Sequence, residues 1–212
     1  TTVKAIRAHF ESAGLAKILG AFQEGAEAGV TRLLAAFYFR QHGEHDGDKT
    51  FEFTHKSFGE YLAANRVVRT LQVISREVSL HEEDADRGRD IVGALAMWAD
   101  VCGPAPLNSY FVRFLNREIL RRERINSGVA REWQQRLSSM LSVAARSGMP
   151  MERLNPRPPT FQEELRQARN AEETLFACAA ACADVTKEIT EVDWPSETSA
   201  GAWIRRIQGQ RK

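Results

Sequence analysis

One stretch decides how the rest of the chain is organised: Phe51-Glu-Phe-Thr-His-Lys-Ser-Phe-Gly-Glu-Tyr-Leu-Ala-Ala64. Phe51, Phe53 and His55 alternate with polar residues, so their side chains share one face of a predicted strand. Ser57 precedes Glu60 by three residues, the spacing of a capping box, so a helix is predicted to begin there. His55 is therefore expected on the inward face of a strand-to-helix joint. The free N–H groups and positive dipole of that helix N-terminus suit an anion such as a phosphate.

The same stretch carries a family resemblance. Residues 53–64, Phe-Thr-His-Lys-Ser-Phe-Gly-Glu-Tyr-Leu-Ala-Ala, resemble the F-x-H-x-S-F-x-E-Y/F-x-A-A segment of NACHT-type STAND NTPases. That family includes NOD-like immune receptors of animals and their bacterial relatives. Its segment closes a winged-helix domain and leads into a second helical domain. The resemblance implies that His55 contacts a bound ADP, with Ser57 as the capping residue beside it. A buried histidine bonded to nearby backbone would fit the same pattern.

The resemblance also implies a domain organisation and a function. Residues 1–64 would form the winged-helix-like end of an NTPase module, and residues 65–212 a helical regulatory domain. The chain would belong to a signalling protein that switches between a closed ADP form and an open, self-oligomerising ATP form, often in defence against phage. ADP or ATP would be held mainly by a P-loop NTPase module before Thr1, and a sensor or repeat region would follow Lys212. The chain begins without Met, so an excised or processed fragment is expected.

Composition sets limits on the class of protein. The 212 residues are 43% hydrophobic and 27% charged, as in a soluble globular protein. The net charge of +1 gives no general attraction to nucleic acid or anionic lipid. No apolar run approaches the ~20 residues of a membrane span. Three cysteines fit a reducing cytoplasm better than secretion. Neither nucleic acid nor a membrane is therefore expected as a partner.

The apolar spacing predicts a mainly α fold: a winged-helix-like subdomain with a short β hairpin, then an α-helical bundle or array. Residues 1–39 are expected to form short helices, and residues 41–50 the turn of the wing hairpin. The helix after Ser57 is expected to have one broad apolar side, formed by Phe58, Tyr61, Leu62, Val68 and Leu71. Its acidic continuation, Arg76–Arg87, is interpreted as a solvated connection.

Four further helices are predicted after this connection, the last over about residues 161–185, followed by a short helix around residues 202–207. The four are lined by Ile91, Leu95, Trp98 and Cys102; by Leu107, Tyr110, Phe111, Phe114 and Leu115; by Val129, Trp133, Leu137, Met140 and Leu141; and by Leu165, Ala168, Leu175, Cys178 and Cys182. The proline-rich residues 149–159 are expected to form a rigid crossing loop.

Several other motifs invite a functional reading. Gly43 and Gly47 lie too close together for a phosphate loop, and Asp48 separates Gly47 from Lys49, so a turn is favoured. The nearby His42, His45, Asp46 and Asp48 suggest a metal cluster, but a solvated loop explains them more simply. Cys178 and Cys182 are interpreted as core residues of an Ala-rich helix. No catalytic residues and no metal ligands are predicted within this chain.

A basic strip gives the rival functions their support. It consists of Arg113, Arg117, Arg121, Arg122 and Arg124 on one predicted helix. One rival is a winged-helix DNA-binding regulator with a helical dimerisation domain, which would use this strip or the 41–50 wing. The other is a stand-alone helical adaptor that binds proteins through exposed helix faces. A solvated face, with Glu118 and Glu123 interleaved, would explain the strip without any function.

Overall fold

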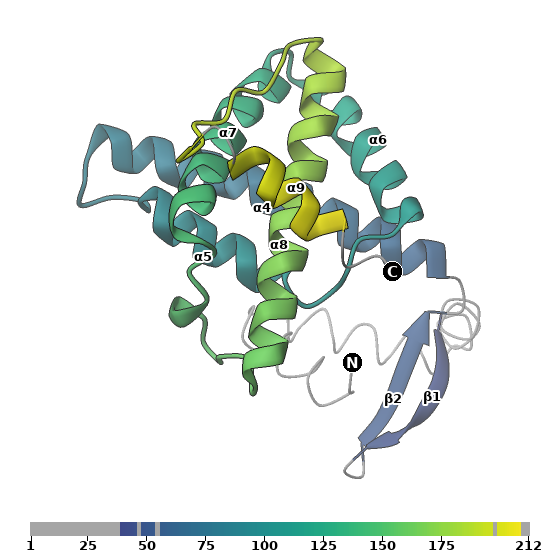
Figure 1. The fold of residues 1–212 in the computed structure, drawn as a ribbon. Coiled ribbons are helices and arrows are strands. Elements are labelled where there is room, and N and C mark those ends of the chain that lie inside the picture. The colour runs from purple at the N-terminus through teal and green to yellow at the C-terminus, as the bar shows by residue number, and fades with distance from the viewer. Residues whose placement is uncertain (1–38, 46–47, 54–55, 197–198, 209–212) are drawn as a thin grey trace. The chain divides into compact units, whose positions relative to one another are not determined.

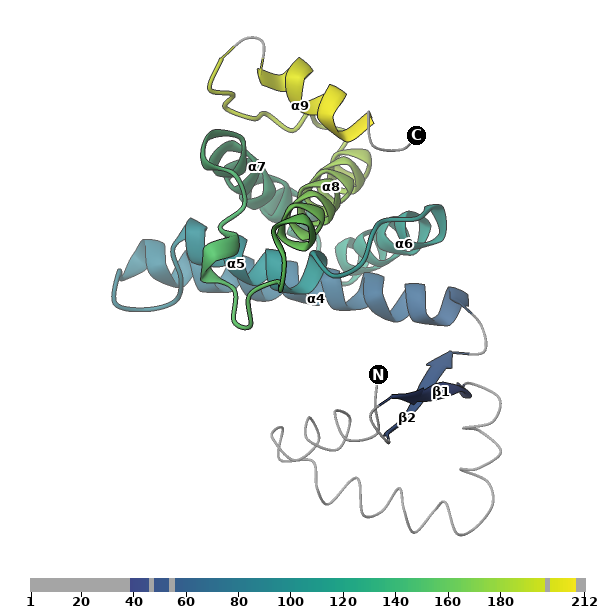
Figure 2. The ribbon, with the colours of Figure 1, turned by 60° about the horizontal axis from the view of Figure 1, so that its bottom comes forward.

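The computed structural model describes four parts of the chain: residues 39–45, 48–53, 56–196 and 199–208 (Figures 1 and 2). The chain divides into two compact units, Thr1–Gly59 and Glu60–Lys212. The described residues are mainly helical, which confirms the predicted class. The predicted domain boundary at residue 64 falls, like the division at Gly59, inside one continuous helix. Among the described residues, no helix combines the length and apolar character needed to cross a membrane.

The described part of the first unit is a pair of antiparallel strands. β1 (Phe39–His45) pairs with β2 (Asp48–Phe53), so that Phe39 lies opposite Phe53 and His45 opposite Asp48. The register shifts between Gln41 and Gly43. Residues 41–45 and 48–50, which were predicted to belong to the wing turn, form parts of these two strands, so the predicted turn is too long. The predicted helices of residues 1–38 lie outside the described residues.

The helix that follows is longer than the sequence indicated. α4 (Lys56–Glu83) continues through most of Arg76–Arg87, so the prediction of a solvated connection there is wrong. Leu71, Ile74 and Val78 are all buried, at helical spacing. This apolar stripe keeps the backbone helical while the acidic residues project outward, so the charged composition of this stretch did not mark a loop. The connection is restricted to residues 84–90.

That short connection depends on a close approach between Gly88 and the end of α4. Gly88 has φ +68°, and a Cβ placed there would lie 2.0 Å from the backbone oxygen of Glu77. The next residue, Arg89, donates its backbone N–H to that same oxygen over 3.1 Å. Only glycine combines a left-handed backbone with so close an approach.

Five more helices and one turn complete the second unit. They are α5 (Ile91–Cys102), α6 (Ser109–Ile125), α7 (Val129–Ser147), the 3₁₀ turn η1 (Met151–Arg153), α8 (Phe161–Thr186) and α9 (Ser199–Gln208). Three begin at side-chain caps, since Asp90, Asn108 and Thr160 accept from the N–H groups of Gly93, Phe111 and Glu163. At α7 the Glu123 carboxylate takes this role, accepting from Gly128 N at 2.7 Å and Ala130 N at 2.8 Å. The helices predicted after residue 90 are confirmed, except that Leu107, assigned to the second of them, precedes α6.

The core lies around α8, which contacts α5, α6 and α7 (Figure 2). Its small residues Ala171, Cys178 and Cys182 are fully buried, which lets neighbouring helices come close. Trp98 of α5 is also fully buried, and its Nε1 donates to the Ala171 carbonyl over 3.0 Å. The prediction that the α8 cysteines are core residues is confirmed.

A few apolar residues predicted to pack remain exposed. Tyr110 of α6 is 56% exposed, and Phe58, Tyr61 and Leu62 near the start of α4 are each about 40% exposed. Further along α4, Val68 and Leu71 are fully buried as predicted. The apolar side of this helix is thus covered by the second unit only from about Ala64 onward. Periodicity identifies an apolar face, whereas the positions of the neighbouring helices decide how much of it is covered.

Replacing Gly88 by alanine is expected to destabilise the protein by about 2–4 kcal/mol, because left-handed strain and the clash with Glu77 add together. Gly128→Ala is the matched control. Gly128 also has positive φ, +91°, but a Cβ there meets nothing within 4 Å, so only the strain of about 1–2 kcal/mol remains. Urea unfolding followed by circular dichroism measures both. Equal losses for the two variants would show that the approach to Glu77 does not constrain the loop.

Candidate functional site

Of the two residues predicted to contact nucleotide, the structure describes only Ser57. His55 lies outside the described residues. Ser57 is exposed and is the second residue of α4, so it does not stand before the helix as the capping-box prediction required. Lys56 opens the helix, and the first turn contains no acidic residue. The positive end of the helix dipole is therefore not countered within its own first turn, which fits an anion.

Glu60, the other member of the predicted capping box, points to a different partner. Its Oε1 accepts from Nδ2 of Asn108 over 2.7 Å, and Asn108 in turn caps α6. Its second oxygen, Oε2, is buried and has no hydrogen-bond partner among the described residues. A buried carboxylate oxygen left without a partner is costly and marks a position that deserves a functional test. Glu60 thus links the start of α4 to α6 instead of closing the N-terminus of α4.

A second polar contact between α4 and α6 surrounds a buried carboxylate. Glu118 of α6 is only 3% exposed. Arg121 binds both of its oxygens, with Nε 2.8 Å from Oε2 and Nη2 2.6 Å from Oε1. Arg122 Nε and Asn65 Nδ2 also donate to Oε1, over 2.9 and 3.2 Å. Arg122 continues to Gln72 of α4. We name Asn65, Gln72, Glu118, Arg121 and Arg122 the Glu118 cluster.

The electrostatics of this cluster favour the charged carboxylate. Hydrogen bonds from Arg121 lower the pKa of Glu118, burial opposes them, and Arg122 adds to the lowering. A buried carboxylate is costly unless it is paired and hydrogen-bonded, and here both conditions are met. Edge-to-face contact of Tyr61 with Phe114, at 5.7 Å between ring centroids, adds an apolar contact between the same helices. The contacts advance in the same direction along both helices, so α4 and α6 run parallel.

The contacts of Glu118 reduce the number of arginines in the basic strip that could bind another molecule. Arg121 and Arg122 are engaged with Glu118, so two of the five predicted strip residues already have a carboxylate partner. Arg113, Arg117 and Arg124 are exposed on α6. The remaining strip is weaker than the sequence suggested, because the buried glutamate offsets positive charge that a phosphate backbone would otherwise meet.

Farther along, α4 is joined to α7 by another pair of polar contacts. The buried Ser75 hydroxyl donates to Glu132 over 2.5 Å. Arg136 of α7 forms a two-pronged ion pair with Glu82, at 2.6 and 3.0 Å, which lowers the pKa of the Glu82 carboxyl. Glu82 was assigned to the solvated connection by sequence and is instead part of a helix–helix contact.

Sequence reasoning missed both sets of contacts between α4 and its neighbours. Glu118 was read as one of the charges that alternate with the arginines of a solvated face. The one sequence feature that indicates the burial of Glu118 is its spacing. Phe111, Leu115 and Glu118 stand at positions i, i+4 and i+7 of α6, so Glu118 lies on the same face of the helix as the two buried apolar residues. Its partner on α4, Asn65, is 53 residues away, and Gln72, the partner of Arg122, is 50 residues from that arginine; no local pattern connects them.

The thiols of the described residues lie in the core. All three cysteines are buried and free, and burial raises their pKa values, that of Cys182 to about 12. Such thiols react poorly because the thiolate is disfavoured. In the part of the chain that the structure describes, no three His, Cys, Asp or Glu side chains gather as a metal site would require. Of the candidate metal cluster, His42 and His45 belong to β1 and Asp48 to β2, whereas Asp46 lies outside the described residues.

Comparisons with protein-family models, with curated proteins and with solved structures find no match to this chain.

Glu118→Gln is expected to destabilise the protein by about 1–3 kcal/mol, because the charge-assisted bonds from two arginines become ordinary ones. Glu152→Gln is the control: this exposed residue uses only its backbone oxygen, which accepts from Arg157. The control is expected to stay within about 0.5 kcal/mol of the parent. Chemical denaturation measures both. A Glu118→Gln protein as stable as the control would show that the charge of Glu118 does not contribute to the stability of the fold.

Acid is expected to weaken the same contacts. The folded-state pKa values of Glu118, Glu82 and Glu123 are all lowered, so their contribution to stability is full above the unfolded value of about 4.3 and is lost as pH falls below it. Unfolding midpoints in urea at pH 7, 5, 4 and 3 report this loss. Glu118→Gln should fall less steeply than the parent between pH 5 and 3, since one titrating group is gone. Parallel curves would contradict the assignment of Glu118.

Proposed function

We propose that this chain is the regulatory winged-helix and helical region of a NACHT-class signalling NTPase, with innate-type or antiphage defence as its setting. It would control the switch between a closed ADP form and an open ATP form that oligomerises. The observation that carries the proposal is the twelve-residue resemblance over residues 53–64, whose last nine residues open α4. His55 and Ser57 would hold ADP or ATP, together with residues outside this chain.

The geometry of α4 supports a relay role. Its first turn carries no acidic residue, which suits a neighbouring phosphate. The helix then runs unbroken to Glu83, past the Glu118 cluster and the contacts to α7. A displacement at its start would therefore reach α6 and α7 as motion of one rigid element. The chain by itself is expected not to hydrolyse ATP, since its sequence lacks the glycine-rich loop, Lys and Ser/Thr of a phosphate-binding motif.

A helical protein-interaction adaptor is the second candidate, favoured by one observation. Tyr61 and Leu62 on α4 and Tyr110 on α6 are large apolar side chains that remain exposed. Aromatic residues of this kind commonly anchor protein interfaces. The DNA-binding alternative has weaker support, because Glu118 engages two of the strip arginines.

The proposal is tested in the full-length natural protein, which is expected to contain a phosphate-loop module upstream of Thr1. His55→Ala should reduce the ADP retained after purification by about tenfold or more, the equivalent of one charge-assisted hydrogen bond of about 1.5–3 kcal/mol. It should also promote self-assembly. Nucleotide released by acid and measured by chromatography, with light scattering for assembly, provides both readouts.

His81→Ala is the control for this experiment, because His81 lies near the far end of α4, where its ring contacts the backbone oxygen of Arg87. It should retain ADP like the parent. Unchanged ADP and unchanged assembly in His55→Ala would overturn the nucleotide role. A full-length protein that carries no nucleotide at all would favour the adaptor.

A further inference from the structure

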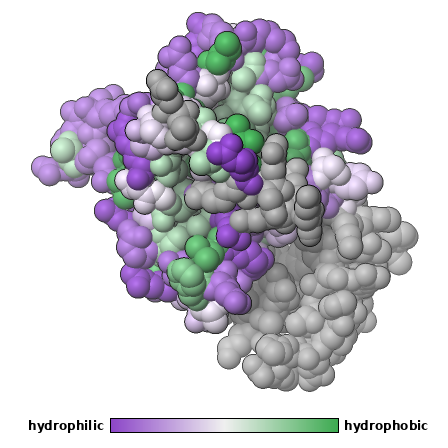
Figure 3. All heavy atoms as spheres, viewed as in Figure 1, coloured by the Kyte–Doolittle hydropathy of each residue, from purple (hydrophilic) through white to green (hydrophobic). Residues whose placement is uncertain are grey.

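An extended segment of the chain lies along α7 after α8 ends. α8 stops at Thr186, where Lys187 adopts a left-handed backbone with φ 60°. Residues 188–193, which we name the 188–193 segment, have neither helix nor strand structure and lead toward α9. Figure 1 shows this part of the chain passing from the top of α8 across α7. In the same view, Figure 3 shows a mostly hydrophilic surface there.

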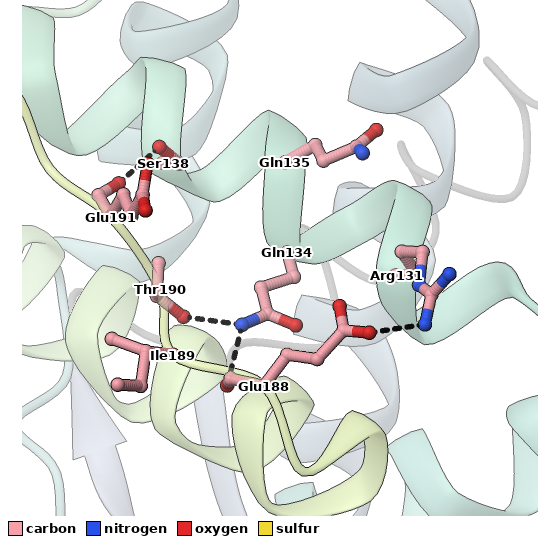
Figure 4. Close-up of a pocket in the computed structure, with 8 residues that line it drawn as sticks. All are labelled: Arg131, Gln134, Gln135, Ser138, Glu188, Ile189, Thr190 and Glu191. Carbon is pink, nitrogen blue, oxygen red and sulfur yellow. Dashed lines mark hydrogen bonds and ion pairs between the residues drawn. The ribbon is translucent and has the colours of Figure 1, made fainter.

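One face of α7 is built to hold this segment. Arg131, Gln134, Ser138, Ser142 and Arg146 recur every three or four residues and so share one side of the helix. We name these five residues the α7 polar stripe. Together they bond, in order along the helix, to Glu188, Thr190, Glu191 and Asp193 of the 188–193 segment. Figure 4 shows the first three in contact with Glu188, Thr190 and Glu191.

Most of the bonds from the middle of the stripe go to backbone atoms. Gln134, which is buried, donates to the Glu188 carbonyl over 3.0 Å, and Ser138 donates to the Glu191 carbonyl. The Asp193 N–H donates to the Ser142 hydroxyl over 2.9 Å. Backbone atoms are common to every peptide, so these contacts recognise an extended chain without selecting its side chains.

Charge at the two ends of the stripe supplies the selectivity. Arg131 pairs with Glu188, and Arg146 pairs with Asp193. The two carboxylates are five residues apart in the segment, and the two arginines are fifteen apart in α7. At rises of about 3.3 Å per residue in an extended chain and 1.5 Å in a helix, the two acidic residues are about 17 Å apart and the two arginines about 22 Å apart. The long arginine side chains cover the difference, so the stripe favours a peptide with two acidic residues about five positions apart.

Space remains between the segment and the helix. A pocket of about 280 Å³ is lined by residues of α7 that include Arg131 and Ser138, and by Glu188–Glu191 of the segment. Ile189 lies within this stretch and is nevertheless 91% exposed. The segment thus does not fill the groove that it occupies, and a peptide with larger side chains would fit.

We propose that the α7 polar stripe is a docking site for an extended acidic peptide of a partner protein, and that the 188–193 segment occupies this site in cis. The peptide carries two carboxylates about five residues apart, as Glu188 and Asp193 do. Binding of the partner displaces the 188–193 segment and frees the chain that leads into α9.

The bonds that hold the segment suit such an exchange. Both ion pairs lie at the surface, where Glu188 and Asp193 are 49% and 71% exposed, so each contributes little and weakens with salt. Covalent attachment nevertheless gives the segment a high effective concentration at the stripe. A partner peptide can bind only those molecules in which the segment has left the stripe. Its apparent affinity is therefore the affinity for the open stripe multiplied by the fraction of molecules that are open.

The test uses a fluorescein-labelled peptide with the sequence of residues 187–195 and the full 212-residue chain, followed by fluorescence anisotropy. The Glu188→Arg/Asp193→Arg chain repels its own segment from Arg131 and Arg146. It should bind the peptide at least ten times more tightly than the parent chain, and the affinity should fall at least fivefold between 50 and 500 mM NaCl. Both substitutions are at exposed positions, and circular dichroism verifies that the fold is retained.

Two further variants complete the experiment. Glu191→Arg changes a residue that gives the stripe only its backbone oxygen, so this chain should bind the peptide no better than the parent. Adding Arg131→Glu and Arg146→Glu to the Glu188→Arg/Asp193→Arg chain restores opposite charges within the molecule and should abolish peptide binding. Similar affinity for all four chains, or binding that is insensitive to salt, would overturn the proposal.

Discussion

The packing of α8 between α5, α6 and α7 is the contact on which the helical unit depends. Its buried face has small residues such as Ala171, Cys178 and Cys182 beside the larger Leu175, so the surrounding helices approach closely and supply most of the large side chains. Trp98 of α5 packs against α8, and its Nε1 donates to the buried Ala171 carbonyl of α8. This bond fixes both the rotation of α5 about its axis and its position along α8. A larger residue on this face of α8 would force the other three helices apart, because a close-packed core has little room to adjust.

α4 joins this core by a mixture of apolar and ionic contacts. Its apolar stripe from Ala64 to Val78 supplies the burial, while Glu118, Glu132 and Arg136 supply directional bonds to its polar side. Apolar contact alone would tolerate sliding between parallel helices, whereas the two hydrogen bonds from Arg136 of α7 to Glu82 of α4 restrict it. This difference explains why a long helix with exposed aromatic residues at its start can still hold one position on α6 and α7. In the proposed nucleotide switch, a movement of α4 would be passed to α6 and α7 through these bonds.

α7 serves two neighbours at once. Trp133, Leu137 and Met140 face the core, and the polar stripe on another side holds the 188–193 segment. The two roles use different physical interactions: the first buries apolar surface, and the second pairs exposed charges and backbone groups. The apolar side of α7 is therefore fixed in the core. On the polar stripe, a partner peptide could replace the 188–193 segment with little loss of stability. The segment leads to α9, whose Trp203 stacks on Phe176 of α8, so its release would affect more than its own six residues.

The sequence by itself determined the mainly helical class, the approximate bounds of α5 to α8 and the burial of the cysteines, because periodicity and caps act over three or four residues. It misplaced the end of α4, since it weighed the acidic residues of 76–87 above the stripe that runs through Val78. The predicted nucleotide contact of His55 stays a prediction. Only the tertiary structure decided that Glu118 is buried beside Asn65, that Glu82 pairs with Arg136 and that residues 188–193 lie on α7. Each of these contacts joins residues about 50 positions apart, and such distances in sequence carry no local signal of proximity in space.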